Sequence, residues 1–330
     1  MRMVPNDLLN QYDLIVKRSQ YSRSNFLLDT NKGKYILRKV NIQTEQILFM
    51  YDAINHLRKN GFMEVEVIYL TKKNLPYATS KGQIYIMQSY TTSNDVEFKD
   101  TTDIKGIIRL LANFHTCGLN FDATERSEKI IHIKDVYVYF QKRIRDTNTL
   151  KKKVLPLSKK TEFEHLFLKD YTTYLTLQHL ALECIDKESI DNLIKYAQTN
   201  KSLAHNDYNY HSVTKIGDNI YLSNLEKCSY NMQILDLCSI LMKVMQKNNW
   251  DTDLLVTLIK EYEDIRTLSP EEKSILKAMM IFPEKFASIC NKYLQCKRRN
   301  NYSMFLVKWN NMIVYKEEQV LAAHFIKDNL

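Results

Sequence analysis

The alternation of hydrophobic and polar residues over the first 90 positions predicts a small antiparallel sheet accompanied by one helix. Short runs with strand-like alternation cover 12–16, 24–28, 34–38, 65–69 and 84–87. Over 43–60 the hydrophobic residues instead recur with the period of a helix, and Gly61 follows as a stop signal. These elements predict a compact β-rich region that carries a helix between its third and fourth strands.

Beyond Asp103 the hydrophobic period is mainly helical. The predicted helices cover 104–116, 129–145, 159–184, 187–198, 233–247, 251–265, 270–281, 284–295 and 314–328. One β-rich island interrupts them, at about 203–225. The chain is therefore predicted to be an α+β protein. Its N-terminal β-rich lobe would cover 1–92, and its helical C-terminal lobe would cover 93–330 and carry the β-hairpin island.

Composition narrows the class of protein without naming a function. The chain has 330 residues, 45% of them hydrophobic and 26% charged, which is enough to build two lobes with separate cores. The net charge of +9 is spread along the chain, and basic runs such as Lys151–Lys153 are typical of solvated surface, so no nucleic-acid partner is predicted. No apolar run reaches the roughly 20 residues of a membrane span, and the N-terminus lacks a signal-peptide core. The six cysteines include no C-x-x-C pair, so we expect reduced thiols in a protein made in the cytoplasm, without a zinc site.

The β-rich island contains the candidate chemistry. His205-Asn206-Asp207 follows a short strand, and after a turn a second alternating strand ends at Asn224. An aspartate in such a position can orient a hydroxyl group and accept its proton during phosphoryl transfer, while the histidine fixes the loop. Taken alone, the same three residues are also typical of a loop stabilised by local hydrogen bonds.

The island resembles the catalytic segment of the aminoglycoside phosphotransferase and choline kinase-like families. Their pattern is His-Gly-Asp, four residues and Asn, then Ile-Asp-Phe/Trp-Glu. The chain is more similar still to the spore coat protein CotS family, a kinase-like branch found in spore-forming bacteria. The segments that carry this similarity include 53–62, 111–115, 225–237, 243–251 and 282–286. The resemblance extends from about residue 12 to residue 300, and it implies a bilobal, protein kinase-like fold.

Transferred position by position, the family pattern is only partly present. His205 and Asp207 match the His-x-Asp pair, so Asp207 stands where the family has its catalytic base. The asparagine that should hold magnesium falls on Ser212, and the metal-binding aspartate falls on Asn224. Magnesium usually has at least one anionic oxygen ligand, and both of these side chains are neutral. The later aspartate of the family, whose role is largely structural, corresponds to Asp236.

The nucleotide-binding positions depart from the family pattern as well. The strand lysine that should grip the phosphates corresponds to Arg38, because alternation places Lys39 on the opposite face. Glu45, on the first helix, is the candidate partner of Arg38. The segment that should cover the phosphates, 17–24, contains no glycine.

Together these features predict a spore coat-associated, kinase-like protein that is catalytically degenerate and acts through protein interactions in coat assembly. We expect other spore coat proteins as partners and no cofactor. The expected location is the spore coat after synthesis in the mother-cell cytoplasm, or alternatively the cytoplasm itself. The alternative function is an active ATP-dependent phosphotransferase acting on a small hydroxyl compound or a protein side chain. In that case Asp207 would be the base, and magnesium and ATP would bind with help from Ser212 or Glu226.

Overall fold

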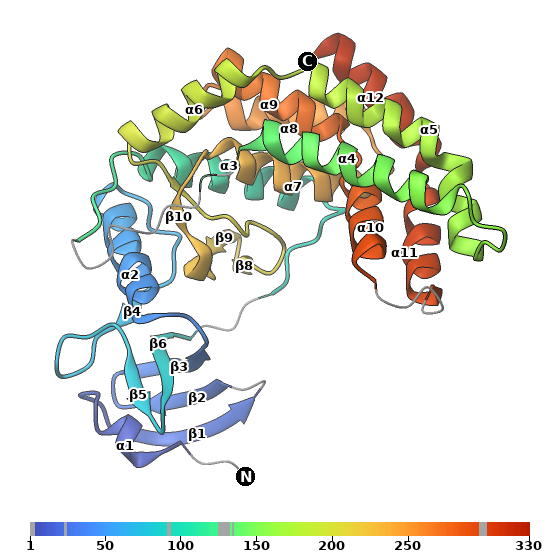
Figure 1. The fold of residues 1–330 in the computed structure, drawn as a ribbon. Coiled ribbons are helices and arrows are strands. Elements are labelled where there is room, and N and C mark those ends of the chain that lie inside the picture. Colours follow the sequence, from blue (N-terminus) through green and yellow to red (C-terminus); the bar gives the residue numbers. More distant parts are fainter. Residues whose placement is uncertain (1–3, 23–24, 91–93, 125–132, 134, 297–301) are drawn as a thin grey trace. The chain divides into compact units, whose positions relative to one another are not determined.

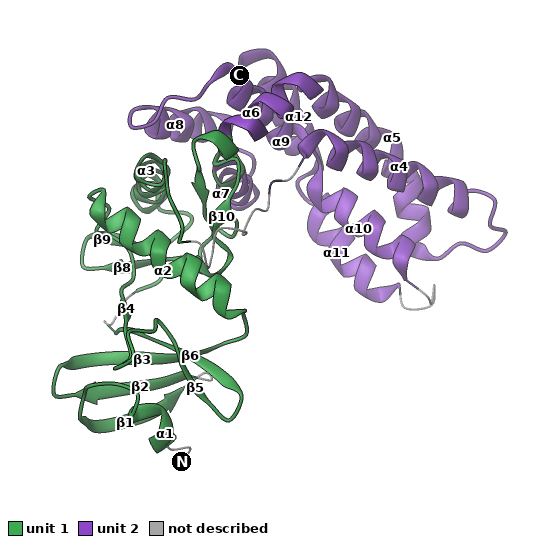
Figure 2. Ribbon diagram, turned by 60° about the vertical axis from the view of Figure 1, so that its left-hand side comes forward, with its two compact units in different colours: residues 1–132, 197–236 green, residues 133–196, 237–330 purple. Residues whose placement is uncertain are grey.

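The computed structural model describes residues 4–22, 25–90, 94–124, 133, 135–296 and 302–330. It divides into two compact units, which Figure 2 colours separately. Unit 1 comprises 1–132 and 197–236, and unit 2 comprises 133–196 and 237–330. Because unit 1 unites the N-terminal sheet with the later β-rich island, every candidate site residue named above lies in unit 1. The predicted division into lobes 1–92 and 93–330 follows secondary structure and stays a prediction.

Unit 1 is built on an antiparallel sheet with the strand order β1-β2-β3-β6-β4, to which β5 adds by pairing with β6 (Figure 1). Its elements before the island are α1 (Asn6–Leu9), β1 (Val16–Ser22), β2 (Asn25–Thr30), β3 (Gly33–Val40), α2 (Thr44–Lys59), β4 (Ile68–Tyr69), β5 (Ala78–Ser80), β6 (Gln83–Ser89) and α3 (Thr101–Cys117). The island contributes β7 (Leu203–Ala204), β8 (Val213–Ile216), β9 (Asn219–Leu222), a 3-10 turn η1 (Leu225–Lys227) and β10 (Ser229–Tyr230). The expected α+β class is therefore present, with the sheet and the helix α2 in the predicted order.

The strand predicted at 12–16 is wrong, because pairing begins only at Val16. Tyr12 is nevertheless 2% exposed and belongs to a hydrophobic cluster with Leu8 of α1, Leu37 of β3 and Met87 of β6. The N-terminal segment thus covers one face of the sheet. Its hydrophobic residues are buried by packing on the sheet, although the segment does not pair as a strand. Alternation of hydrophobic residues alone therefore gave the wrong element.

Helix α2 follows its predicted pattern closely. Its buried positions are Ile47, Phe49, Met50, Ala53, Ile54 and Leu57. Gly61 follows the helix with φ of +92°, a backbone conformation that glycine adopts without strain. The strand predicted over 65–69 is reduced to the two residues of β4, while Val65 makes an isolated bridge to Leu222 of the island. This bridge attaches the segment after α2 to the hairpin β8–β9.

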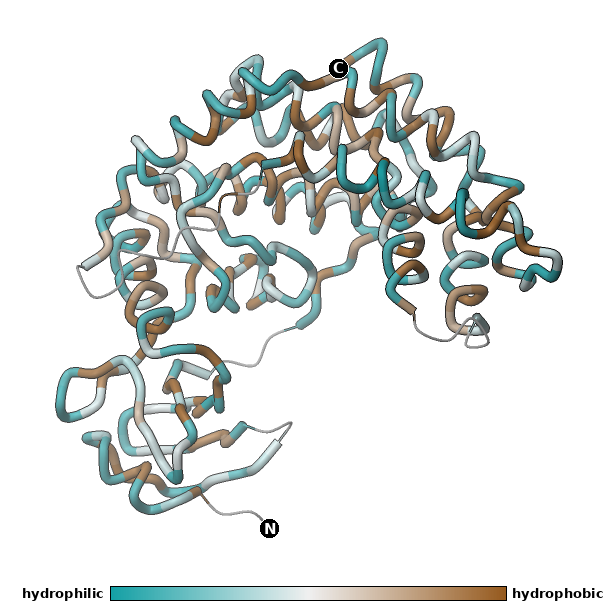
Figure 3. Tube along the Cα trace, in the orientation of Figure 1, coloured by the Kyte–Doolittle hydropathy of each residue, from teal (hydrophilic) through white to brown (hydrophobic). Residues whose placement is uncertain are grey.

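Unit 2 is helical. Its helices are α4 (Val136–Val154), α5 (Glu162–Glu183), most of α6 (Lys187–Thr199) and of α7 (Ile234–Lys247), α8 (Thr252–Glu263), α9 (Pro270–Ile281), α10 (Glu284–Gln295), α11 (Ser303–Ile313) and α12 (Lys316–Asn329). Hydrophobic and hydrophilic residues alternate around these helices in Figure 3, as expected for amphipathic helices packed on a common core. Trp309 of α11 is fully buried against the rings of Phe163 and Phe286.

Two helices of unit 2 differ from the prediction. The helix expected at 129–145 falls partly on 129–132 and 134, outside the described residues, and α4 continues to Val154. Helix α11 was missed, although Phe305, Trp309 and Met312 are buried along one of its faces. Their spacing of four and three residues is the signal that could have predicted it.

Candidate functional site

The candidate site is built on the loop that follows β7, and Asp236 holds this loop in place. Its Oδ2 accepts a hydrogen bond from the backbone N–H of His205 at 2.6 Å, and its Oδ1 accepts one from that of Asn206 at 2.8 Å. Asp236 is 2% exposed, so these are buried, charge-assisted bonds, which are stronger than neutral ones. Asn206 adopts φ of +62°, a conformation that asparagine tolerates better than most residues. These two bonds agree with the structural role that the family resemblance implies for Asp236.

His205 is a buried, neutral residue of this loop. Its Nδ1 accepts a hydrogen bond from the backbone N–H of Asp207 at 3.2 Å, and its Nε2 donates to the carbonyl oxygen of Ser223 at 3.0 Å. Burial lowers the pKa of His205, because an imidazolium would lose its hydration there. The histidine therefore positions the aspartate and ties the loop to β9's end.

Both carboxylate oxygens of Asp207 are engaged. Oδ2 forms a salt bridge of 2.6 Å with the ammonium group of Lys227, and Oδ1 accepts a hydrogen bond of 2.8 Å from the side-chain amide of Asn209. The Asp207 side chain is nevertheless 42% exposed. An accessible carboxylate is thus present at the expected position, and an adjacent cation compensates its charge.

Ser212 and Asn224, which stand at the family's metal positions, contact the protein backbone instead. The hydroxyl group of Ser212 donates to the carbonyl oxygen of Asn209 at 2.7 Å and accepts from its N–H at 2.8 Å, and Ser212 is 1% exposed. The amide of Asn224 donates to the carbonyl oxygen of His211 at 2.6 Å. Neither position offers an anionic oxygen, so the pair does not fit the usual magnesium ligand set. Within the described ranges, no three His, Cys, Asp or Glu side chains gather so as to hold a metal ion.

Arg38 of β3 lies in a cluster of charged residues brought together from three segments. Its guanidinium forms a salt bridge with Glu226 of η1, lies 3.9 Å from Glu66, and donates to Gln88 of β6 at 3.2 Å. The Arg38 side chain is 22% exposed, whereas Lys39 is exposed, as the alternation predicts. Arg38 is therefore fixed by carboxylates of unit 1.

The expected pairing of Arg38 with Glu45 does not occur. Glu45 is exposed in the first turn of α2, and its hydrogen bond is to the hydroxyl group of the neighbouring Thr44 at 3.2 Å. The carboxylates that reach Arg38 come instead from Glu66 and Glu226. A contact made by a first-turn residue depends on the direction in which the helix leaves the sheet, which the sequence pattern does not give.

Glu66 is a residue of the candidate site that the sequence did not reveal. Burial raises the pKa of Glu66, and the nearby carboxylate of Glu226 raises it further, while Arg38 opposes both effects. Its Oε1 is buried and has no hydrogen-bond partner in the part of the chain described here. Lys227 was missed as well, although a basic residue directly after Glu226 is visible in the sequence. Three carboxylates, those of Asp207, Glu66 and Glu226, thus surround two cations, Arg38 and Lys227, at the candidate site.

The chain has the fold of the kinase-like phosphotransferases. An aminoglycoside phosphotransferase from Alicyclobacillus acidocaldarius superposes with a TM-score of 0.84 at 16% identity, covering 100% of this chain and 98% of that one. Spectinomycin phosphotransferase APH(9)-Ia superposes with a TM-score of 0.62 at 14% identity, covering 97% of this chain and 95% of that one. At such low identities the similarity establishes the fold, and it confirms the kinase-like architecture predicted from the sequence.

The family follows from sequence comparison. Residues 5–324 match the family described as "Spore coat putative kinase YutH", and the chain belongs to this family. It is also 22% identical over 307 residues to spore coat protein S of Bacillus subtilis (strain 168), covering 92% of this chain and 87% of that protein. The resemblance to kinase-like spore coat proteins is thereby confirmed. No helix in the described part of the chain is both long and apolar enough to cross a membrane.

Proposed function

We propose that this protein is a spore coat component that keeps the kinase-like fold without transferring phosphate, and that it acts by binding other coat proteins. The proposed location is the coat, reached after synthesis in the mother-cell cytoplasm. One observation carries the proposal. The carboxylate that would accept the hydroxyl proton is paired with Lys227, and the two adjoining metal positions hold neutral side chains bonded to the backbone.

The chemistry of phosphoryl transfer explains why this combination is unfavourable. The reaction depends on positioned cations that neutralise charge on the phosphates, and on a free carboxylate that orients the attacking hydroxyl. At this site Lys227 forms a salt bridge with Asp207, and Arg38 forms one with Glu226, so each cation already has an anionic partner. A nucleotide would have to break these pairs and bind without an anionic metal ligand at position 212 or 224.

An active phosphotransferase remains the second candidate, and the intact loop favours it. Asp236, His205 and Asp207 keep the hydrogen bonds that present the carboxylate, and Asp207 is accessible. In that case ATP and magnesium would be required. Calorimetric titration with ATP and Mg²⁺ separates the two candidates. We expect dissociation constants weaker than about 1 mM, whereas tight binding followed by turnover would favour the enzyme.

A second experiment examines Asp207 in the sporulating organism. Asp207→Asn keeps the size of the side chain, and we expect the free energy of unfolding to change by only about 1 kcal/mol, with normal delivery to the coat. Leu111→Ala is the matched control for loss of folding, since Leu111 is 0% exposed and its truncation should cost about 2–5 kcal/mol. A stable and correctly localised Asp207→Asn protein that fails to support the coat would sink the scaffold proposal.

A further inference from the structure

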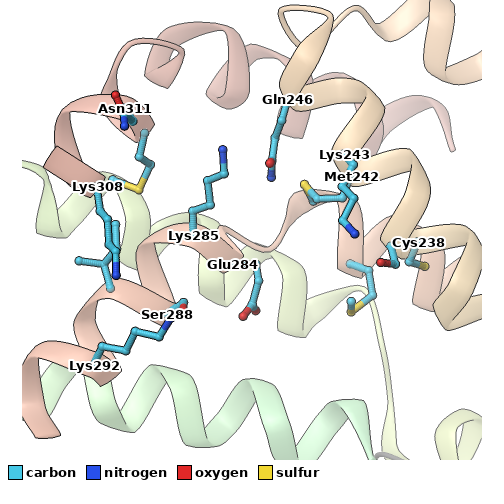
Figure 4. A pocket seen from close by; sticks show the side chains of 14 residues that line it. Cys238, Met242, Lys243, Gln246, Glu284, Lys285, Ser288, Lys292, Lys308 and Asn311 are labelled. Atoms are coloured by element: carbon cyan, nitrogen blue, oxygen red, sulfur yellow. The ribbon is translucent and has the colours of Figure 1, made fainter. Parts of the chain in front are cut away.

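Unit 2 contains a cavity that the candidate site does not use. It has a volume of about 520 Å³, is open to solvent on one side, and is lined by residues of α7, α9, α10 and α11. This volume is within the range of about 300–1,000 Å³ that is usual for small-molecule sites. Figure 4 shows its side chains, with Lys285 of α10 standing between Asn311 on one side and Gln246 on the other. The cavity therefore has the size of a ligand site, and a lysine of α10 is part of its lining.

The cavity is strongly basic. Lys243, Lys285, Lys292 and Lys308 line it, against a single acidic residue, Glu284. The carboxylate of Glu284 accepts a hydrogen bond of 2.6 Å from the hydroxyl group of Tyr139. In the described part of the chain, Lys285, Lys292 and Lys308 form no ion pair. An anion bound in this cavity would gain Coulomb attraction to several positive charges at once.

The rest of the lining is apolar. Met242, Met279, Ile289 and Met312 supply hydrophobic surface between the lysines. Methionine side chains adapt to irregular shapes and often line sites that accept apolar groups. Partial burial lowers the pKa of Lys285, because its ammonium group loses part of its hydration in this surrounding. The lining thus combines apolar contact area with the positive charge of several lysines.

We propose that this cavity binds a small organic anion with an apolar, preferably aromatic, body and a carboxylate, sulfonate or phosphate group. The apolar body lies against the methionines and Ile289, and the acidic group is held by Lys285 together with Lys308 or Lys292. The inference goes beyond the proposed coat function and does not depend on it, because it concerns residues of unit 2 alone.

Two fluorescent probes of the same shape test the proposal. 8-Anilinonaphthalene-1-sulfonate carries an anionic group, and N-phenyl-1-naphthylamine has the same aromatic body without it. We expect the full chain to bind the sulfonate at one saturable site. The double variant Lys285→Gln/Lys308→Gln should bind it about tenfold or more weakly, the scale of a lost charge-assisted contact, and should bind the neutral probe nearly unchanged. Raising the salt concentration should weaken the binding of the sulfonate probe and leave the binding of the neutral probe unchanged.

Two further variants serve as controls. One removes a lysine that lies elsewhere, and the other tests whether the probes bind inside the cavity. Lys152→Gln removes an exposed lysine of α4 that does not line the cavity, and it should leave both affinities unchanged. Ser288→Trp places a bulky ring in the cavity and should abolish binding of both probes, with circular dichroism checking that each variant is folded. Equal sulfonate affinity in the wild type and the lysine double variant would overturn the proposal. A hexaglutamate peptide that displaces the sulfonate at lower concentration than phenyl phosphate does would also overturn it, in favour of an acidic protein partner.

Discussion

Replacing Arg38 by methionine tests whether the charge cluster around β3 supports the fold of unit 1. The substitution keeps a long side chain but leaves Glu226 without its salt bridge and Glu66 without the only cation near it among the described ion pairs. Breaking a fully buried pair in this way costs about 3–5 kcal/mol. Since the Arg38 and Glu226 side chains are 22% and 28% exposed, water compensates part of the loss. We therefore expect the free energy of unfolding to fall by about 2–3 kcal/mol.

The placement of the tryptophans provides a suitable assay. The chain has two, Trp250 and Trp309, and both lie in unit 2. Urea unfolding followed by far-ultraviolet circular dichroism reports on both units, whereas tryptophan fluorescence reports on unit 2. Arg38→Met should shift the circular dichroism transition to lower urea. A smaller shift of the fluorescence transition would show that the two units unfold separately.

Two further variants make the reasoning refutable. Lys39→Met removes an exposed cation from the adjacent position of the same strand and should change stability by less than about 0.5 kcal/mol. In the double variant Arg38→Met/Glu226→Gln, the uncompensated carboxylate is gone, so the two losses should be less than additive by about 1–2 kcal/mol. The cluster would have no stabilising role if Arg38→Met lowered the free energy of unfolding no more than Lys39→Met does. The same conclusion would follow if the loss in the double variant equalled the sum of the two single losses.

Two other predictions concern carboxylates of the same unit. Burial raises the pKa of Glu66 above its usual value of 4.5. The Glu66 carboxyl group therefore binds its proton more tightly in the folded state than in the unfolded state. The stability that protonated Glu66 contributes is fully present below about pH 4.5 and is lost as the pH rises through the raised pKa. Glu66→Gln should flatten this fall in urea midpoints measured between pH 4.5 and 8, and an unchanged slope would contradict the assignment. Asp236→Asn should cost about 2–3 kcal/mol, because the backbone N–H of His205 or that of Asn206 would lose its acceptor, and the charge that strengthens both bonds would be gone. Amide hydrogen exchange at His205 and Asn206 should accelerate, and unaltered protection there would refute the anchoring role.

The sequence by itself determined most of the elements that build the site. Local periodicity was sufficient for α2, since its buried face depends on the spacing of residues within one helix. The loop of His205 and Asp207 was likewise found from its residues, because the His-x-Asp order is visible in the sequence. Some of its hydrogen bonds are local, but the bonds that anchor it to Asp236 and Ser223 come from distant positions. Where a hydrophobic run packs without pairing, as at Tyr12, periodicity gave the wrong element.

Tertiary structure alone decided which charges meet. Alternation placed Arg38 and Lys39 on opposite faces of a strand, but it could not give the partner of Arg38, and the family resemblance suggested Glu45. The partners in the structure are Glu66 and Glu226, the latter 188 positions away in the chain. A charge pair depends on where distant segments are brought by packing of the whole unit, and no local pattern encodes that distance. The pairing of Lys227 with Asp207 across the loop was hidden from the sequence for the same physical reason.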